Sequence, residues 1–261
     1  MMSKIRYPIS YFFKAIKNTV YYLKNKKLIL DFFKDYGYIK IKPFNLFKWH
    51  HGLFLFTGQD KLGERVFIKL TKLKRILKNE NQAYKRLIKN DFLKSHLIEH
   101  RRYIKKGPYK ALILKHSNGI VLNENWLINN INKLETLIKI VDEFKKMSLV
   151  HRDIKLDNFI YENDTVKIFD FSFMIDKTDK HKLKEIDLSN HKNVLKLIDL
   201  GVNYKPSPLK WDDYYSLHVI FKGVLRNMDK SLSLEQKKVL LQYQEECKMK
   251  MNVNTYTILK F

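Results

Sequence analysis

The chain has 261 residues, of which 45% are hydrophobic and 13% aromatic, and its 51 Lys and Arg against 27 Asp and Glu give a formal net charge of +24. This length allows one large domain or two modest lobes with a real core, and the composition excludes a wholly disordered or collagen-like chain. The single cysteine, Cys247, excludes an intramolecular disulfide framework and a cysteine-based zinc cluster, so a reducing compartment such as the cytoplasm is expected.

Residues 1–35 are predicted to be helical and basic. Between residues 7 and 24, lysines lie off an apolar stripe at helical spacing, formed by Ile9, Phe12, Phe13, Ile16, Val20 and Leu23. The run is too short and too interrupted to span a bilayer, and it lacks a small-residue cleavage site, so no secretory signal is expected. Two interpretations stay open: the helix lies on an anionic membrane surface, such as the inner face of a membrane, or it packs on the body of the protein.

The positive charge is concentrated in the first 110 residues, which carry +20 of the total +24. Such a field attracts polyanions such as nucleic acid, anionic lipid or a phosphorylated glycan. The plainer interpretation is a solvated, lysine-rich surface. Nucleic acid is not the expected partner, because the sequence has neither zinc-finger spacing nor an aromatic strand of the RNA-binding type.

The next part of the chain is rich in predicted strands. Gly37 and Pro43 indicate turns between the helical segment and the first strands. Short apolar and aromatic runs then predict strands at Leu46–Trp49, Leu53–Phe56, Arg65–Leu70 and Ala111–Leu114, and apolar periodicity predicts a helix over Leu73–Ile88.

The rest of the chain is mainly helical. It contains a helix at Ile128–Met147, a hairpin formed by Asn158–Tyr161 and Val166–Phe169, and helices at Asp212–Arg226 and Leu234–Lys250. Strands early and helices late predict an α+β fold of two unequal lobes. The predicted segments are a basic helical extension over residues 1–43, a β-rich lobe over 44–115 and a mainly helical lobe over 116–261.

One segment carries recognisable chemistry. His151-Arg152-Asp153-Ile154-Lys155-Leu156-Asp157-Asn158 is followed, after the hairpin, by Asp170-Phe171-Ser172. ATP-dependent phosphoryl transfer needs one carboxylate that orients the acceptor hydroxyl and takes its proton, and an amide and a second carboxylate that hold Mg²⁺. A chance match of five such residues at these spacings is on the order of one in ten thousand.

On these residues the sequence resembles the eukaryotic-type protein-kinase superfamily. The resemblance implies a kinase-like bilobal fold with ATP and Mg²⁺ as cofactors. It implies that Asp153 is the catalytic base, that Asn158 and Asp170 are magnesium ligands, and that Lys155 lies near the transferred phosphate.

The resemblance extends in both directions, over about residues 44–226. Val66-Phe67-Ile68-Lys69 resembles the strand whose lysine holds the nucleotide phosphates, and Glu80 is the best candidate for its ion-pair partner. The backbone of Lys115, His116 and Ser117 would meet the adenine. Trp211-Asp212-Asp213 resembles the start of the helix whose buried aspartate, here Asp213, supports the catalytic loop around His151 and Arg152.

The departures from the family pattern bear on activity and substrate. Only Gly52 remains where a typical phosphate loop has three glycines, and Ser172 stands where Asp-Phe-Gly has its glycine. No Ala-Pro-Glu follows, and the chain ends soon after the Asp213 helix. These reductions, with the strong basicity, are similar to bacterial kinases that phosphorylate lipopolysaccharide-core or other envelope sugars.

The function expected is therefore a Mg-ATP phosphotransferase acting on a hydroxyl of a protein Ser or Thr, or alternatively of an envelope glycan. Two further alternatives stay open. One is a nucleotide-binding pseudokinase or scaffold, and the other is a polyanion-binding module that rests on charge alone.

Overall fold

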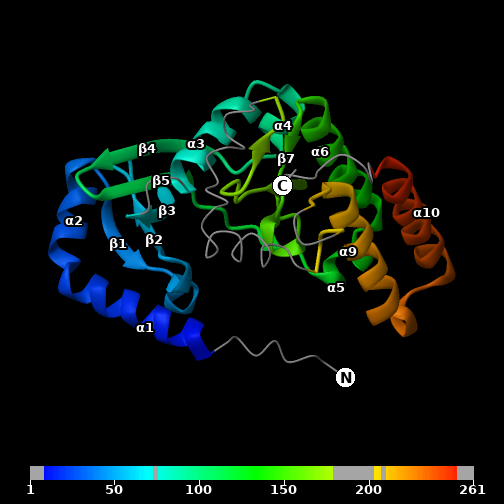
Figure 1. Ribbon diagram of the computed structural model, residues 1–261, viewed down its shortest axis with the longest axis horizontal. Helices are drawn as coiled ribbons and strands as arrows, with labels where there is room; N and C mark the ends of the chain where they lie inside the picture. The colour runs from blue at the N-terminus through cyan, green and yellow to red at the C-terminus, as the bar shows by residue number, and fades with distance from the viewer. Residues whose placement is uncertain (1–8, 73–75, 179–202, 207–209, 252–261) are drawn as a thin grey trace, which may run out of the picture. The chain divides into compact units, whose positions relative to one another are not determined.

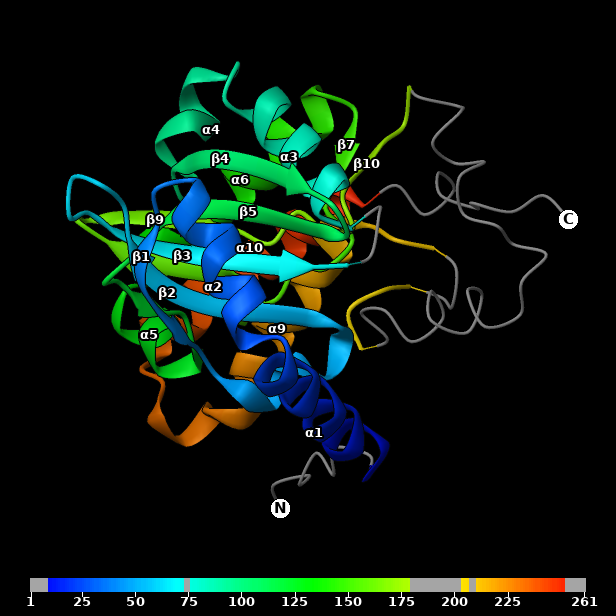
Figure 2. The same ribbon diagram turned by 90° about the vertical axis from the view of Figure 1, so that its left-hand side faces the viewer.

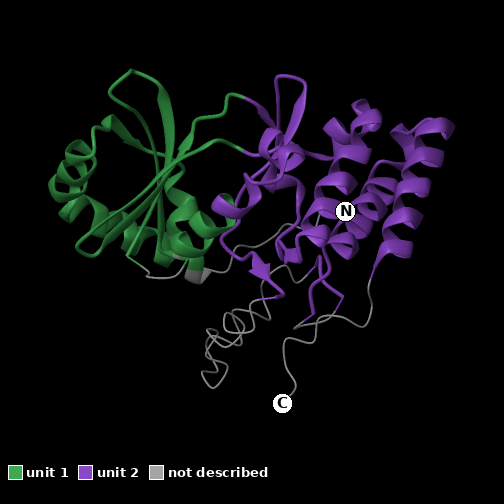
Figure 3. Cartoon of the chain, turned by 90° about the horizontal axis from the view of Figure 1, so that it is seen from above, with its two compact units in different colours: residues 1–84, 98–118 green, residues 85–97, 119–261 purple. Residues whose placement is uncertain are grey.

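The computed structural model describes residues 9–72, 76–178, 203–206 and 210–251 (Figure 1). The chain forms two compact units (Figure 3). Unit 1 contains residues 1–84 and 98–118, and unit 2 contains residues 85–97 and 119–261.

Unit 1 is built on a five-stranded antiparallel sheet with the strand order β1-β2-β3-β5-β4. Its central strands are β2 (Leu53–Gln59), β3 (Arg65–Thr71) and β5 (Tyr109–Lys115), and the sequence predicted the greater part of each. The edge strands β1 (Ile39–Pro43) and β4 (His100–Lys106) were not predicted. Both edge strands are mostly exposed and carry lysine or arginine, which is how proteins protect sheet edges from further pairing.

The prediction of a strand at Leu46–Trp49 is wrong. This segment begins the 3-10 helix η1 (Leu46–His51). Asn45 and Gly52 at its two ends have φ angles of 44° and 73°, so the backbone turns instead of extending. Trp49 is fully buried while the three residues before it are exposed, so the pattern is that of one anchored side chain and not of strand alternation.

Helices α1 (Ile9–Lys24) and α2 (Lys26–Asp35) pack on one face of this sheet (Figure 2). The Phe56 ring lies 5.5 Å from the rings of both Tyr22 in α1 and Phe33 in α2. The aromatic side chains of this core are Tyr22, Phe32, Phe33, Tyr38, Trp49, Phe54, Phe56 and Tyr109. Residues 9–35 are therefore part of unit 1 and share its core.

Helix α3 (Ile76–Leu87) contributes to both units, because the boundary between them falls after Tyr84. The structure describes this helix from Ile76 onward, and the first residues of the predicted helix, 73–75, lie outside the described residues. A short helix, α4 (Asp91–Ser95), follows within unit 2, with the Asn90 side chain accepting a hydrogen bond from the backbone N–H of Leu93.

Unit 2 is mainly helical. The single helix predicted over Ile128–Met147 is wrong, because the chain forms α5 (Glu124–Asn129), the 3-10 turn η2 (Ile131–Lys133) and α6 (Leu134–Lys146). The interruption comes at Asn130, whose side chain donates to the backbone carbonyl of Trp126 and competes with continuation of the helix. The later helices are α9 (Asp213–Asn227) and α10 (Leu234–Lys250), close to the predicted bounds, with the 3-10 turn η4 (Asp229–Ser231) between them.

Short strands of unit 2 surround the chemically informative segment. The predicted hairpin is present as β8 (Phe159–Glu162) and β9 (Thr165–Ile168), and β6 (Ile120–Val121) pairs with β8. A second pair joins β7 (Leu149–Val150) to β10 (Ile175–Asp176). The 3-10 turn η3 (Leu156–Asn158) lies between β7 and β8 in the chain, directly before the hairpin.

The predicted α+β class is confirmed, with a small antiparallel β-rich unit and a mainly helical unit. The order of elements is consistent with the protein-kinase-like fold that the resemblance implied. The units differ from the three predicted segments, since residues 1–43 belong to unit 1 and residues 85–97 to unit 2. Among the described helices, none is both long and apolar enough to cross a lipid bilayer.

Candidate active site

Lys69 lies in β3 and is almost fully buried. In the sheet register it stands between Leu55 of β2 and Leu112 of β5, so its strand neighbours are apolar. Its Nζ donates to Oε1 of Glu80 on α3 at 2.8 Å, and the Glu80 side chain is fully buried. A buried ammonium needs such a partner, because an unpaired charge in a core is very costly. The predicted pairing of Lys69 with Glu80 is present, and its role in holding nucleotide phosphates stays a prediction.

Gly52 lies between η1 and β2, and its own backbone groups are used within unit 1. Its N–H donates to the carbonyl of Trp49 at 3.1 Å, and its carbonyl accepts from Oγ1 of Thr71 at 3.0 Å. Its φ of 73° is open to glycine and strained for other residues. This N–H closes the turn at the end of η1 by binding the Trp49 carbonyl. The contact of Gly52 with phosphate stays a prediction.

The predicted adenine-binding segment follows the end of β5. The N–H of Lys115 donates to the carbonyl of Glu99 at 2.8 Å, and the N–H of His116 donates to the carbonyl of Arg65 at 3.1 Å. The His116 ring also lies 3.3 Å from the Arg65 guanidinium, measured from Nε2 to Nη2. These bonds fasten Lys115 and His116 to the sheet, and Ser117 continues the chain without regular structure. Their contact with adenine stays a prediction.

In unit 2, the loop after β7 brings three predicted site residues together. Nζ of Lys155 donates to Oδ2 of Asp153 at 2.8 Å. Nδ2 of Asn158 donates to the same Oδ2 at 3.0 Å and to the Asp153 carbonyl at 2.7 Å. The Asp153 carboxylate is thus held in one orientation by two side chains from its own loop, which is the preorganisation that proton transfer requires.

Asp170 follows β9 and acts electrostatically on the same loop. The N–H of Phe169 donates to the carbonyl of Asn158 at 3.1 Å, which ties the end of the hairpin to this loop. Burial lowers the pKa of Lys155, but the nearby carboxylates of Asp153 and Asp170 outweigh it, so the pKa is raised above its ordinary value. Lys155 therefore stays a cation at neutral pH, with its ammonium 2.8 Å from Oδ2 of Asp153.

Two residues of this region, Arg152 and Asp170, have positive φ angles of 69° and 66° without being glycine. Such a backbone costs about 1–3 kcal/mol and persists where surrounding bonds hold it. Arg152 is held by its own Nε, which donates to the carbonyl of Phe173 at 2.6 Å, and the Asp170 carboxylate accepts from Oγ of Ser172 at 2.9 Å. The backbone strain therefore lies at Arg152, directly before Asp153, and at Asp170 itself.

The donor set of this loop fits Mg²⁺. Both hydrogen bonds of the Asn158 side chain use Nδ2, so its Oδ1 faces no donor in the described part of the chain. An amide oxygen and a carboxylate are the hard ligands that Mg²⁺ prefers, usually one or two from protein with phosphate oxygens completing the shell. No cluster of three His, Cys, Asp or Glu able to hold a metal occurs among the described residues.

Asp213, the first residue of α9, binds the backbone of the loop that contains Asp153. Its carboxylate accepts the backbone N–H of His151 at 2.7 Å and that of Arg152 at 3.1 Å. Full burial raises the pKa of the Asp213 carboxyl to about 7, although the two N–H bonds act to lower it. The Asp212 side chain caps α9 by accepting from the N–H groups of Tyr214 and Tyr215. The two aspartates thus have different structural tasks.

His151 and Arg152 are buried beside Asp213. Burial lowers the pKa of His151 to about 4, so its imidazole is neutral at neutral pH and packs against the rings of Phe144 and Phe171. Burial also lowers the pKa of Arg152 to about 10, and its guanidinium lies 5.3 Å from the centre of the Trp211 ring. The structure brings together the three residues predicted to support the loop.

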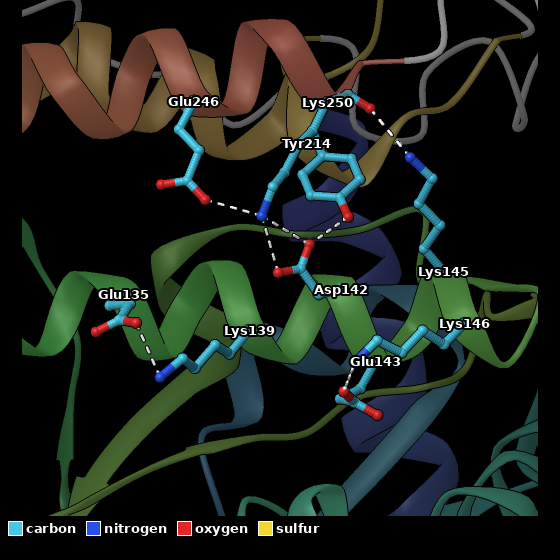
Figure 4. Close-up of polar contacts among 9 residues, drawn as sticks. All are labelled: Glu135, Lys139, Asp142, Glu143, Lys145, Lys146, Tyr214, Glu246 and Lys250. Atoms are coloured by element: carbon cyan, nitrogen blue, oxygen red, sulfur yellow. Dashed lines mark hydrogen bonds and ion pairs between the residues drawn. The ribbon is translucent and has the colours of Figure 1, made fainter.

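Helix α9 is in turn fixed by a cluster around Asp142 of α6 (Figure 4). Oδ1 of Asp142 accepts from the Tyr214 hydroxyl at 2.6 Å, and its Oδ2 accepts from Nζ of Lys250 at 2.9 Å. Glu246 pairs with the same ammonium at 2.8 Å. Neither Asp142 nor Thr71, whose hydroxyl binds the Gly52 carbonyl, was predicted from the sequence. No sequence signal marks either residue, because one lies in a charged helix and the other ends an ordinary strand.

No model of a known protein family matches the sequence, and no curated protein matches it. Among solved structures, the crystal structure of the kinase domain of PF14_0431 matches with a TM-score of 0.49 and 15% sequence identity. The match covers 70% of this chain and 62% of that one, so the chain spans less than two thirds of its length. At this level the likeness assigns neither activity nor substrate, and the function rests on the residues of this chain.

Proposed function

We propose that this chain is a Mg²⁺-dependent ATP phosphotransferase that moves a γ-phosphoryl group to a hydroxyl. The observation that carries the proposal is the Asp153 carboxylate, whose Oδ2 accepts from both Lys155 and Asn158. Its Oδ1 accepts no hydrogen bond from the described residues. We assign this oxygen to the acceptor hydroxyl, because a base must present a lone pair to the proton that it takes.

The assigned roles follow from the chemistry of each group. Asp153 orients the acceptor and takes its proton as the hydroxyl oxygen forms a bond to the γ-phosphorus and the bond from that phosphorus to ADP breaks. Lys155 keeps Asp153 in place and supplies positive charge beside it. Asn158, through Oδ1, and Asp170 would hold Mg²⁺, which supplies charge neutralisation at the phosphates when bound. Lys69, oriented by Glu80, would hold the nucleotide phosphates.

The acceptor is a hydroxyl of a protein or of a glycan. The His151-Arg152-Asp153-Ile154-Lys155 form of the loop favours a Ser or Thr side chain, whereas the +20 charge of residues 1–110 favours an anionic envelope glycolipid. Incubating the protein with radiolabelled ATP and either a cell-envelope extract or a protein pool separates the two. Label that enters only protein removes the glycan acceptor, and label that enters only glycolipid removes the protein acceptor.

The second candidate is a nucleotide-binding protein without catalysis. It is favoured by the Gly52 backbone, because the N–H and carbonyl of the only glycine kept from the phosphate loop are bonded to Trp49 and Thr71. Such a protein would show a thermal shift with Mg-ATP and no turnover in an ATPase or autophosphorylation assay.

The test of the proposed reaction compares Asp153→Asn with Asp157→Asn. The two aspartates lie four residues apart in one loop, but Asp157 is exposed and contacts neither Lys155 nor Asn158 through a hydrogen bond. Loss of the base should lower phosphoryl transfer about 100-fold or more. Asp157→Asn should transfer as the parent does, and both variants should keep the thermal shift with Mg-ATP. Full activity of Asp153→Asn would refute the assignment.

A further inference from the structure

Helix α1 exposes its apolar stripe to solvent and buries its other side. Phe13 and Leu23 expose 63% and 61% of their surface, and Phe12, Ile16 and Val20 are also exposed. The buried residues of the same helix are Ala15 and Tyr22, and Tyr22 belongs to the core of unit 1. A helix that packs only for stability buries its apolar stripe, so this orientation needs another explanation.

The orientation of α1 is held by specific contacts. Nδ2 of Asn18 donates to the carbonyl of Trp49 at 2.6 Å, and the Tyr22 ring lies 5.4 Å from the Trp49 ring. The hydroxyls of Tyr21 and Tyr109 lie 2.9 Å apart, which joins the helix to β5. These three contacts come from the side opposite the exposed stripe, so the stripe is fixed outward by the fold.

Lysines border the exposed stripe. At about 100° of rotation per residue, Phe12, Phe13, Ile16, Val20 and Leu23 fill an arc of roughly 100°. Lys17 and Lys24 fall at one edge of that arc and are exposed. The next helix, α2, begins with the exposed pair Lys26 and Lys27, followed by the exposed Leu28. An apolar stripe with lysines along its edge is the pattern of helices that lie in a lipid interface.

We propose that α1 docks unit 1 onto an anionic lipid surface, with its apolar stripe among the acyl chains and Lys17 and Lys24 at the headgroups. Charge complementarity selects this occupant. A second copy of the chain, which also carries a net charge of +24, would be repelled by the same lysines, and nucleic acid would leave the aromatic side chains of the stripe without an apolar partner. The proposal goes beyond the proposed phosphoryl transfer and does not depend on it.

The experiment measures flotation of the full chain with vesicles, without nucleotide. One set is phosphatidylcholine, and the other is three parts phosphatidylcholine to one part phosphatidylglycerol. The apolar variant is Phe13→Gln/Leu23→Gln, and its matched control is Leu62→Gln/Leu234→Gln, which changes two apolar side chains that are each 87% exposed outside α1. The charge variant is Lys17→Gln/Lys24→Gln, with Lys94→Gln/Lys238→Gln as the control for two exposed lysines elsewhere. Thermal melts by circular dichroism show that each variant is folded.

Binding to the anionic vesicles alone, weakened by added salt, is the expected result for the parent. Phe13→Gln/Leu23→Gln should lower the partition coefficient about tenfold or more, and Lys17→Gln/Lys24→Gln about tenfold, while both controls stay near the parent. Absence of vesicle binding, equal binding to both lipid sets, or unchanged binding of Phe13→Gln/Leu23→Gln would overturn the proposal. Self-association in gel filtration that this variant abolishes, without vesicle binding, would make the stripe a contact between copies and would also overturn it.

Discussion

The buried pair of Lys69 and Glu80 allows a quantitative test of how unit 1 is held together. The two charged atoms lie 2.8 Å apart, and 4% and 0% of their side chains are exposed. At an effective dielectric constant of about 20, this separation gives an attraction of about 6 kcal/mol. Desolvating each ion costs several kcal/mol, so the intact pair contributes little net stability. Removing one partner takes this ion pair away from a charge that stays buried.

The perturbation is a double-mutant cycle with Lys69→Met, Glu80→Met and Lys69→Met/Glu80→Met. Each single variant should lose about 3–5 kcal/mol of unfolding free energy. The double variant should be more stable than either single variant, because two apolar side chains of similar volume remove both buried charges. Urea unfolding followed by circular dichroism measures the loss, and hydrogen exchange in β3 and α3 locates it in unit 1.

The matched control is Lys106→Met, which breaks an ion pair with Asp35. That pair is shorter, at 2.6 Å, but 62% and 49% of the two side chains are exposed. Water already screens it, so its loss should leave the urea midpoint unchanged. The reasoning fails if Lys69→Met and Glu80→Met unfold at the same urea concentration as Lys106→Met. It also fails if the double variant is less stable than both single variants.

The remaining predictions concern unit 2. Because burial raises the pKa of Asp213 to about 7, the stability from its protonated form is present below about pH 4 and is lost as the pH rises to about 7. Asp213→Asn does not titrate, so its stability relative to the parent should rise by on the order of 4 kcal/mol across that range, measured by urea unfolding at a series of pH values; a pH-independent difference would contradict this. Ser233 caps α10, accepting from the N–H of Gln236 at 3.1 Å while its own N–H donates to the Gln236 side chain at 2.9 Å. Ser233→Ala should therefore cost about 1 kcal/mol by the same method, whereas the exposed Ser231→Ala should cost almost nothing, and equal effects would rule out the capping role.

The central strands and late helices were predictable because their local patterns match their final surroundings. Four of the seven residues of β3 are apolar, at Val66, Phe67, Ile68 and Leu70, and a strand buried on both faces needs such a run. The bounds predicted for α10 agree with the structure because Ser233 and Gln236 form a local capping box. In both cases, the residues that decide the element lie within it or next to it.

The errors fall where distant contacts decide. The strands β1 and β4 pair on one side only, so they carry charges that hide the strand pattern. At Leu46–Trp49, an aromatic run that reads as a strand becomes a turn, because Trp49 is drawn into a core built from α1, α2 and β2. Propensity is a weak prior when one large side chain has such a site to fill.

For the candidate site, motif spacing and the family resemblance together pointed to Asp153, Lys155 and Asn158, and their closeness was predictable because they lie within six consecutive residues of one loop. Their chemical states came from folding. The neutral His151, the raised pKa of Asp213 and the engaged backbone of Gly52 all depend on burial or on partners far along the chain. Likewise, the amphipathic pattern of α1 can be recognised from its sequence. The side that faces the core is set by the contacts of Asn18 and Tyr22 with Trp49. Local order follows from neighbouring residues, whereas desolvation and the choice of buried face exist only once distant segments have packed.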